Sequence, residues 1–324
     1  MRRFKHRRWW LLLAVVVLAG GAFFAFWHSA ETRFWPTWLG DERPEAVIND
    51  VRQHAVMTAT NRHAWIAKYG TPQKVAARIH NLTDLRAAVA EANPHSSVYL
   101  PGEARDITRP TVVTEQGYEW IDLPSFWPNS FKEPSVIVYI NTVNRAVQKA
   151  QGGIIIDLRN NYGGSPQVMI MAVAALVPQG DIFSLVPKNG PAQPWTLQNQ
   201  GIVANGSGGD QLTLDKPFPK RTGLKVAVLV SKRTASAAEF TALALRNNPK
   251  VKIFGTPTGG FLSGNVGQSY SYLGHTLIVS MTTSWAKDNA GKVYHEDPIY
   301  PDKILPANDQ QALSKAVFDW LNAK

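Results

Sequence analysis

The chain has 324 residues, of which 44% are hydrophobic and 18% charged, and its formal net charge is +10. This length can form one large domain or two modest ones, and the composition is that of a globular protein rather than a disordered one. The chain contains no cysteine, which excludes disulfides, thiolate metal sites and a cysteine nucleophile. After residue 30 the basic residues are scattered among acids, so we expect no nucleic-acid partner.

The first thirty residues predict a basic cytoplasmic tail followed by a membrane anchor. A basic cluster precedes the apolar run 9–27, which carries no charge and has tryptophans at both ends. A helix of this length spans a hydrocarbon core of about 30 Å. The basic cluster favours the cytoplasm, which places residues 31–324 outside the cell. A cleaved signal peptide, with its cleavage site near Gly20, is the alternative.

Residues 31–94 predict an aromatic linker and a small helical subdomain. Apolar residues recur at helical spacing from residue 43 to residue 69, with one polar break. Thr71 followed by Pro72 indicates a helix start, because a threonine cap and a proline in the first turn both favour it. We expect Thr83 to cap the next helix.

Residues 95–324 predict an α/β core with a mixed sheet. The continuous apolar runs 153–158 and 224–230 are typical of strands buried on both faces. Helical patterns over 136–147, 166–177 and 308–322 alternate with the strands. The stretch 180–222 is rich in Gly, Pro, Asn and Gln, which indicates a β-rich cap or a flexible lid inserted into the core.

A serine flanked by small residues directly follows the second apolar strand. Ser236 lies in the segment Thr234-Ala-Ser-Ala-Ala-Glu239, at an expected strand-to-helix turn. This geometry exposes a nucleophilic hydroxyl, and the helix start directs unpaired N–H groups to a developing oxyanion. Alternatively, Ser236 only caps the helix, with Glu239 completing a capping box.

Two further segments carry chemistry. Asp157-Leu-Arg-Asn-Asn-Tyr-Gly-Gly164 follows the first apolar strand, and its paired glycines allow close backbone approach to a ligand. His95 lies in a loop, within Asn93-Pro-His-Ser-Ser97. Considered alone, the segment 157–164 is equally explained as an ordinary turn, and His95 as a solvated residue of a loop.

In this order the three segments resemble the C-terminal-processing (tail-specific) and tricorn-core serine peptidase family. The segment 296–302, an acid followed by an apolar pair and Pro-Asp, is similar to the closing segment of that family. The resemblance covers roughly residues 95–305. It implies a serine peptidase that acts on peptide bonds without a cofactor.

Two departures from the family pattern define a subgroup. Phe261 occupies the place of the lysine that serves as base in many members, so the resemblance assigns the base to His95. A neutral imidazole suits proton abstraction at neutral pH. The spacing after His95 is also too short for the PDZ domain of typical members. The chain resembles a membrane-anchored branch of the family that lacks this domain. This resemblance implies cleavage of a lanthionine-containing, nisin-like peptide antibiotic, and the cleavage gives resistance to that antibiotic.

The resemblance implies the following site. Ser236 is the nucleophile, His95 the base and Glu296 a third, acidic member, while Ala237 and Gly163 or Gly164 donate N–H groups to the oxyanion. Peptide substrate is expected to contact Asn160, Asn161, Thr234 and Gly260. No metal site is expected, because the histidines lack ligand spacing. Two alternatives remain open: a general processing peptidase of exported proteins, and a non-catalytic extracytoplasmic ligand-binding module.

Overall fold

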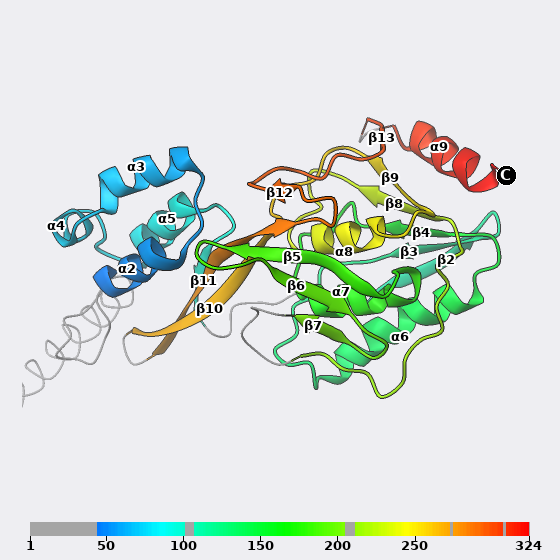
Figure 1. Cartoon of the computed structure of the whole chain (residues 1–324), viewed down its shortest axis with the longest axis horizontal. Coiled ribbons are helices and arrows are strands. Elements are labelled where there is room, and N and C mark those ends of the chain that lie inside the picture. The colour runs from blue at the N-terminus through cyan, green and yellow to red at the C-terminus, as the bar shows by residue number, and fades with distance from the viewer. Residues whose placement is uncertain (1–43, 101–106, 205–210, 273–274, 307–308, 324) are drawn as a thin grey trace, which may run out of the picture. The chain divides into compact units, whose positions relative to one another are not determined.

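The computed structural model describes residues 44–100, 107–204, 211–272, 275–306 and 309–323 (Figure 1). The predicted anchor and linker lie outside these residues. Within the described ranges, none of the helices combines the length and the apolar character needed to cross a bilayer. The chain divides into two compact units: Met1–Glu103 with Gly267–Met281, and Ala104–Val266 with Thr282–Lys324. We call them unit 1 and unit 2.

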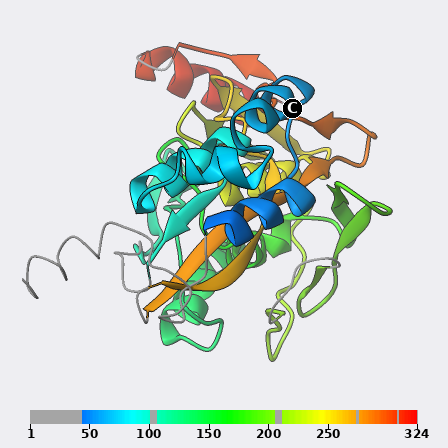
Figure 2. The ribbon, with the colours of Figure 1, turned by 90° about the vertical axis from the view of Figure 1, so that its left-hand side faces the viewer.

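The described part of unit 1 is mainly helical. Its helices, blue and cyan in Figure 2, are α2 (Pro44–His54), α3 (Ala59–Tyr69), α4 (Pro72–Ala76) and α5 (Leu82–Ala92). Trp65 is buried at their centre and donates its indole N–H to the carbonyl of Ala88 at 2.8 Å. Strand β1 (Ser97–Tyr99) pairs antiparallel with residues 278–280. Val98 and Val279 are buried in the same core as the helices.

The helix starts in unit 1 follow capping chemistry. Thr71 accepts the N–H of Lys74 at 3.4 Å, with Pro72 in the first turn, as predicted. The predicted cap at Thr83 is wrong, because α5 begins two residues earlier. There the side chain of Asn81 accepts the N–H of Asp84 at 3.0 Å. Asparagine is at least as good a cap as threonine, and Thr83 falls inside the first turn.

Unit 2 contains a six-stranded sheet in the order β13-β9-β8-β4-β3-β2. Its strands are β2 (Thr111–Glu115), β3 (Tyr118–Asp122), β4 (Ile154–Asp157), β8 (Val226–Val230), β9 (Val251–Gly255) and β13 (Lys303–Ile304). Neighbouring strands run parallel except in the β2–β3 hairpin, so the sheet is mixed, as predicted. Because the five strands other than β2 run in the same direction, the loops after β4 and β8 leave at the same edge of the sheet.

Both faces of this sheet are covered. One face packs against α6 (Pro134–Lys149), α7 (Pro166–Ala172), the short helix η2 (Ala174–Leu176) and α8 (Ala237–Arg246). The other face packs against α9 (Gln310–Asn322), which is red in Figure 1. On β4, Ile154 and Ile156 belong to the first core and Ile155 to the second. The predicted burial of this strand on both faces is therefore confirmed.

The stretch after η2 forms an antiparallel group of strands that belongs to the core of unit 2. It consists of β5 (Gly180–Pro187), β6 (Gln193–Leu197) and β7 (Ile202–Ala204). Phe183 lies 5.2 Å from Trp195 and 4.8 Å from Phe240 of α8, measured between ring centres. The described part of the stretch is β-rich, and its aromatic side chains are part of the main core. A separate cap over residues 180–222 stays a prediction.

The remaining strands are β10 (Ser263–Tyr272), β11 (His275–Lys287) and β12 (Val293–Tyr294). Residues 284–287 of β11 pair with β5, and its last two residues also pair with β12. The division between the units falls inside β10 and β11. The sequence placed residues 95–103 and 267–281 with the core. The structure groups them with the helices, because Val98, Leu277 and Val279 are buried in the helical core.

Candidate active site

Ser236 occupies the turn between β8 and α8 in a conformation that non-glycine residues rarely adopt. Its φ is 53° and its ψ is −120°. Among the described residues, only Gln116, Ser236 and Glu296 are non-glycine residues with positive φ. Gln116 lies in the hairpin turn between β2 and β3, where positive φ is expected. The other two are the predicted nucleophile and the predicted acid, and such strain clusters at active sites.

Gly163 lies directly against Ser236. A Cβ atom added to Gly163 would lie 2.8 Å from Cβ of Ser236 and 3.0 Å from the carbonyl oxygen of Ala235. The same two turns are joined by the N–H of Ala235, which donates to the carbonyl of Asn161 at 3.1 Å. The loop after β4 and the loop after β8 therefore meet at the serine, as the edge of a parallel sheet allows.

Two residues predicted to contact substrate hold these loops together. Asn161 and Thr234 are both fully buried. The side chain of Asn161 donates to the carbonyl of Leu123 at 2.7 Å. The hydroxyl of Thr234 donates to the carbonyl of Leu158 at 2.8 Å. Their side chains face the interior, whereas that of Asn160 is exposed.

The predicted oxyanion donors differ in availability. The N–H of Gly163 already donates to Oδ1 of Asn161 at 2.8 Å. Within the described residues, the N–H groups of Ala237 and Gly164 have no hydrogen-bond partner. Gly164 is fixed in place, because a Cβ atom there would lie 2.1 Å from the carbonyl oxygen of Phe126. Ala237 and Gly164 thus supply the available N–H groups.

Glu239 connects the serine turn with the turn that follows β9. Its buried carboxylate accepts the N–H of Ser236 at 3.0 Å, as the predicted cap requires. It also accepts the N–H groups of Gly260 at 2.9 Å and Phe261 at 2.8 Å, and the hydroxyl of Thr258. Burial raises the pKa of Glu239 against the opposing effect of these hydrogen bonds. Of these contacts, the sequence predicted only the capping box, in which Glu239 accepts the N–H of Ser236.

The turn bound by Glu239 also touches the segment that carries Glu296. Thr258 accepts the N–H of Ile299 on its hydroxyl at 2.8 Å. A Cβ atom on Gly260, whose φ is +85°, would lie 2.7 Å from the carbonyl oxygen of Glu296. Gly260 therefore permits close packing of two backbones, and its N–H is taken by Glu239.

Glu296 itself has a φ of 65°. Burial raises the pKa of its carboxyl group, and the charge of the neighbouring Asp297 raises it further. A strained, partly buried acid is unusual for a surface loop and is typical of a functional position.

His95 lies in unit 1, in the loop between α5 and β1. The side chain of buried Asn93 holds this loop, since its oxygen accepts the N–H of His95 at 2.9 Å and its amide donates to Val56 at 3.2 Å. Burial lowers the pKa of His95 to about 4, so the imidazole is neutral at neutral pH. Ser236 belongs to unit 2, and its pairing with His95 stays a prediction.

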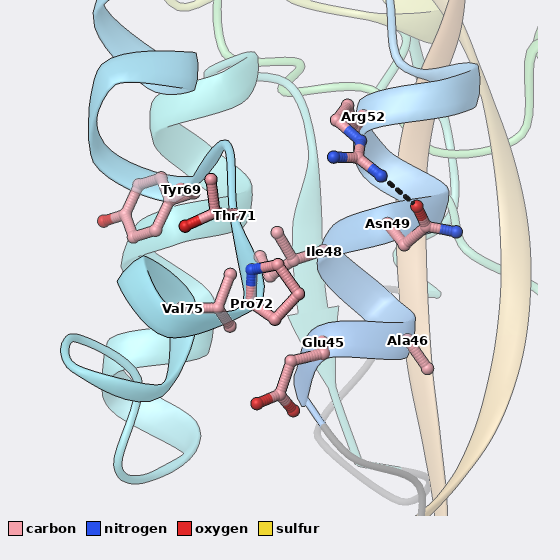
Figure 3. A pocket seen from close by; sticks show the side chains of 9 residues that line it. All are labelled: Glu45, Ala46, Ile48, Asn49, Arg52, Tyr69, Thr71, Pro72 and Val75. Atoms are coloured by element: carbon pink, nitrogen blue, oxygen red, sulfur yellow. Dashed lines mark hydrogen bonds between the residues drawn. The ribbon is translucent and has the colours of Figure 1, made fainter.

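Other parts of the described chain offer less chemistry. A mostly apolar pocket of about 280 Å³ in unit 1 lies between α2 and the turn from α3 to α4 (Figure 3). In it, Arg52 of α2 donates to Asn49 and to the carbonyl of Gly70. None of the predicted site residues lines this pocket. Across the described ranges, no group of three or more potential metal ligands is found.

Comparison with known proteins identifies the family of this chain. Residues 120–305 match the model of peptidase family S41, which is more than half of the chain. The chain therefore belongs to peptidase family S41, and this confirms the resemblance found in the sequence.

Individual relatives match only parts of their length. The nisin-resistance protein of Lactococcus lactis subsp. lactis is 31% identical over 205 residues, which is 63% of this chain and 60% of that protein. A carboxyl-terminal-processing protease of Synechocystis sp. is 27% identical over 190 residues, 59% of this chain and 38% of the relative. A solved lipoprotein structure from Streptococcus agalactiae shares the fold, with a TM-score of 0.64, 21% identity and coverage of 86% and 94%.

Proposed function

We propose that this chain is a serine endopeptidase in which Ser236 attacks a peptide carbonyl. The observation that carries this proposal is the strained conformation of Ser236, at the start of α8 and against Gly163. A serine that only capped a helix would need no positive φ, because caps normally have extended backbone. A strained serine in a sharp strand-to-helix turn, here between β8 and α8, is typical of a nucleophile turn.

In the proposed mechanism His95 takes the proton of the Ser236 hydroxyl as Oγ bonds to the carbonyl carbon. The carbonyl electrons move to the oxygen, which accepts the N–H groups of Ala237 and Gly164. Collapse of this intermediate breaks the C–N bond, and the amine leaves with the proton from His95. Water then hydrolyses the acyl-enzyme with His95 again as base. Glu296 is the proposed third member.

For the substrate we propose a nisin-like lanthionine peptide, so that cleavage confers resistance. The likeness to a nisin-resistance protein supports this substrate. The likeness to a carboxyl-terminal-processing protease supports the second candidate, a processing peptidase of exported proteins. We further propose that residues 9–27 anchor the chain in the cell membrane with the peptidase on the outer side, on the sequence evidence alone.

The test uses the full chain and its Ser236→Ala variant, each incubated with nisin and with an unmodified peptide of similar charge, and followed by mass spectrometry. Truncation of nisin by the wild type alone supports both nucleophile and substrate. Cleavage of only the unmodified peptide favours the processing peptidase. Absence of Ser236-dependent cleavage of either peptide, and of a broader peptide mixture, favours a non-catalytic ligand-binding module.

A further inference from the structure

An unpaired cationic turn immediately precedes the nucleophile segment. Lys232 and Arg233 are adjacent and exposed, between β8 and Thr234. Within the described part of the chain, neither forms an ion pair with a carboxylate. Two neighbouring cations without an acidic partner leave a local positive potential that attracts anions.

The side chain of Arg233 is held in place by an aromatic ring. Its Cζ atom lies 5.0 Å from the centre of the Tyr162 ring. Tyr162 is 47% exposed, although it is a large aromatic residue between the buried Asn161 and the buried Gly163. Stacking on a ring fixes the plane of a guanidinium while leaving its N–H groups free to bind, which reduces the entropy lost on binding.

The backbone beneath this pair is rigid. The N–H of Arg233 donates to Oγ of Ser231 at 3.0 Å, and that hydroxyl donates to the carbonyl of Arg159 at 2.6 Å. On the other side, the N–H of Tyr162 donates to Oγ of buried Ser125 at 2.8 Å. The pair therefore sits on the same two loops that meet at the serine.

Chain connectivity limits how far the pair can lie from Ser236. Tyr162 directly precedes Gly163, which contacts Ser236. Arg233 is three residues before Ser236, so their Cα atoms are at most about 11 Å apart. A peptide residue advances the chain by about 3.3 Å, so the guanidinium can reach a group a few residues from the scissile bond.

We propose that Arg233, oriented by Tyr162, binds a carboxylate of the peptide substrate close to the bond that Ser236 attacks. The planar fork of arginine matches a carboxylate with two parallel hydrogen bonds, and carboxylates are the anions that an unmodified peptide carries. The carboxylate comes either from an aspartate or glutamate side chain or from the C-terminus of the substrate. This inference rests on the proposed peptidase function, since it names a feature of its substrate.

The experiment compares peptides that differ only in one carboxylate. A peptide cleaved by the full chain is resynthesised with its terminal carboxylate as an amide, or with Asp and Glu near the scissile bond replaced by Asn and Gln. We expect kcat/KM to fall roughly 10- to 100-fold for one of these changes, as for loss of a charge-assisted hydrogen bond. The change that has this effect identifies the source of the carboxylate.

Variants test whether Arg233 causes the preference for the peptide that carries the carboxylate, measured as kcat/KM. Arg233→Gln is expected to abolish it, Tyr162→Phe to keep it and Tyr162→Ala to weaken it. Arg145→Gln, which removes an exposed cation on α6, is the control and should keep the preference. A wild type that cleaves all peptides equally well, or a preference that survives in Arg233→Gln, overturns the proposal.

Binding separates this proposal from the peptidase function. In a Ser236→Ala background, fluorescence polarisation measures the affinity of a labelled short peptide with a free or an amidated terminus, or with Asp in place of Asn. An Arg233-dependent preference without any cleavage by the wild type supports the carboxylate site and rejects the peptidase. Ser236-dependent cleavage without a carboxylate preference in either assay rejects the carboxylate site alone.

Discussion

The backbone N–H of Ser236 donates a hydrogen bond to Oε2 of Glu239 at 3.0 Å. Because the same carboxylate binds the N–H groups of Gly260 and Phe261, the angle of the serine turn depends on a loop more than twenty residues further along the chain. The buried carboxylate of Glu239 thus positions the proposed nucleophile through its backbone.

Replacing Glu239 by glutamine tests this relationship. The amide offers one acceptor oxygen and sets an NH₂ donor against N–H groups that need an acceptor, so the turn should shift. We expect kcat to fall at least about 10-fold with little change in KM, and the free energy of unfolding to fall by about 2–3 kcal/mol. Steady-state kinetics and urea denaturation measure the two effects. Glu115→Gln, at an exposed position, should change neither.

Gly163→Ala should disable the serine without unfolding the protein. The new Cβ atom would collide with Ser236, and a displacement of about 1 Å in an active site can cost about 100-fold in rate. Gly190→Ala is the matched control, since Gly190 also has positive φ but open space around it. Both variants should lose about 1–2 kcal/mol of stability from backbone strain, and only Gly163→Ala should lose kcat. Equal activities would contradict the contact.

The pH profile tests His95. Its pKa is lowered to about 4 by burial, so the acid limb of kcat/KM should lie well below the ordinary histidine value of 6.5. The sign for stability follows from the same shift. As pH falls from 6.5 towards 4, the unfolded chain binds a proton that the folded chain does not, so folding becomes less favourable.

His95→Gln should remove this part of the pH dependence of the unfolding free energy, and it should reduce kcat by several orders of magnitude at every pH. An acid limb centred at 6.5 in the wild type would show that the base is a solvated imidazole.

Glu296 offers a test in which stability and activity change in opposite directions. Glu296→Gly should relieve the backbone strain at φ 65° and raise the free energy of unfolding by up to about 1 kcal/mol. If the carboxyl group assists catalysis, both Glu296→Gly and Glu296→Gln should lower kcat at least about 10-fold. Retained activity in Glu296→Gln would remove Glu296 from the mechanism.

Absence of cysteine allows a clean test of membrane topology. Lys149→Cys places one thiol at an exposed position of unit 2, and Lys5→Cys places one before the apolar run. In intact cells a membrane-impermeant maleimide should label the first and not the second, and both should react after lysis. Labelling of Lys5→Cys in intact cells would contradict the proposed orientation.

The sequence was most informative where a pattern has one physical solution. Short, mostly apolar runs such as 153–158 are typical of buried strands, and the structure has β4 there. A serine among small residues after such a strand indicated the turn at 236. Family membership follows from the same motifs.

Other features could not be read from the sequence because they depend on contacts between distant segments. The donors to Glu239 are mostly backbone N–H groups, which leave no signature in residue type. The strands within 180–204 have no regular period, and their burial comes from aromatic contacts with Phe240. Asn161 fits the family motif equally well as a binder or as a structural residue, and only its burial distinguishes the two roles.

The meeting of separate loops at Ser236 has a consequence for folding. Segments near residues 126, 163, 236 and 260 must all be in place before the serine turn has its shape. Contacts between segments so far apart in sequence form late, because each closes a long loop at an entropic cost. A newly made or partly unfolded chain therefore lacks an assembled nucleophile. The proposed proteolytic activity would appear only with the finished fold.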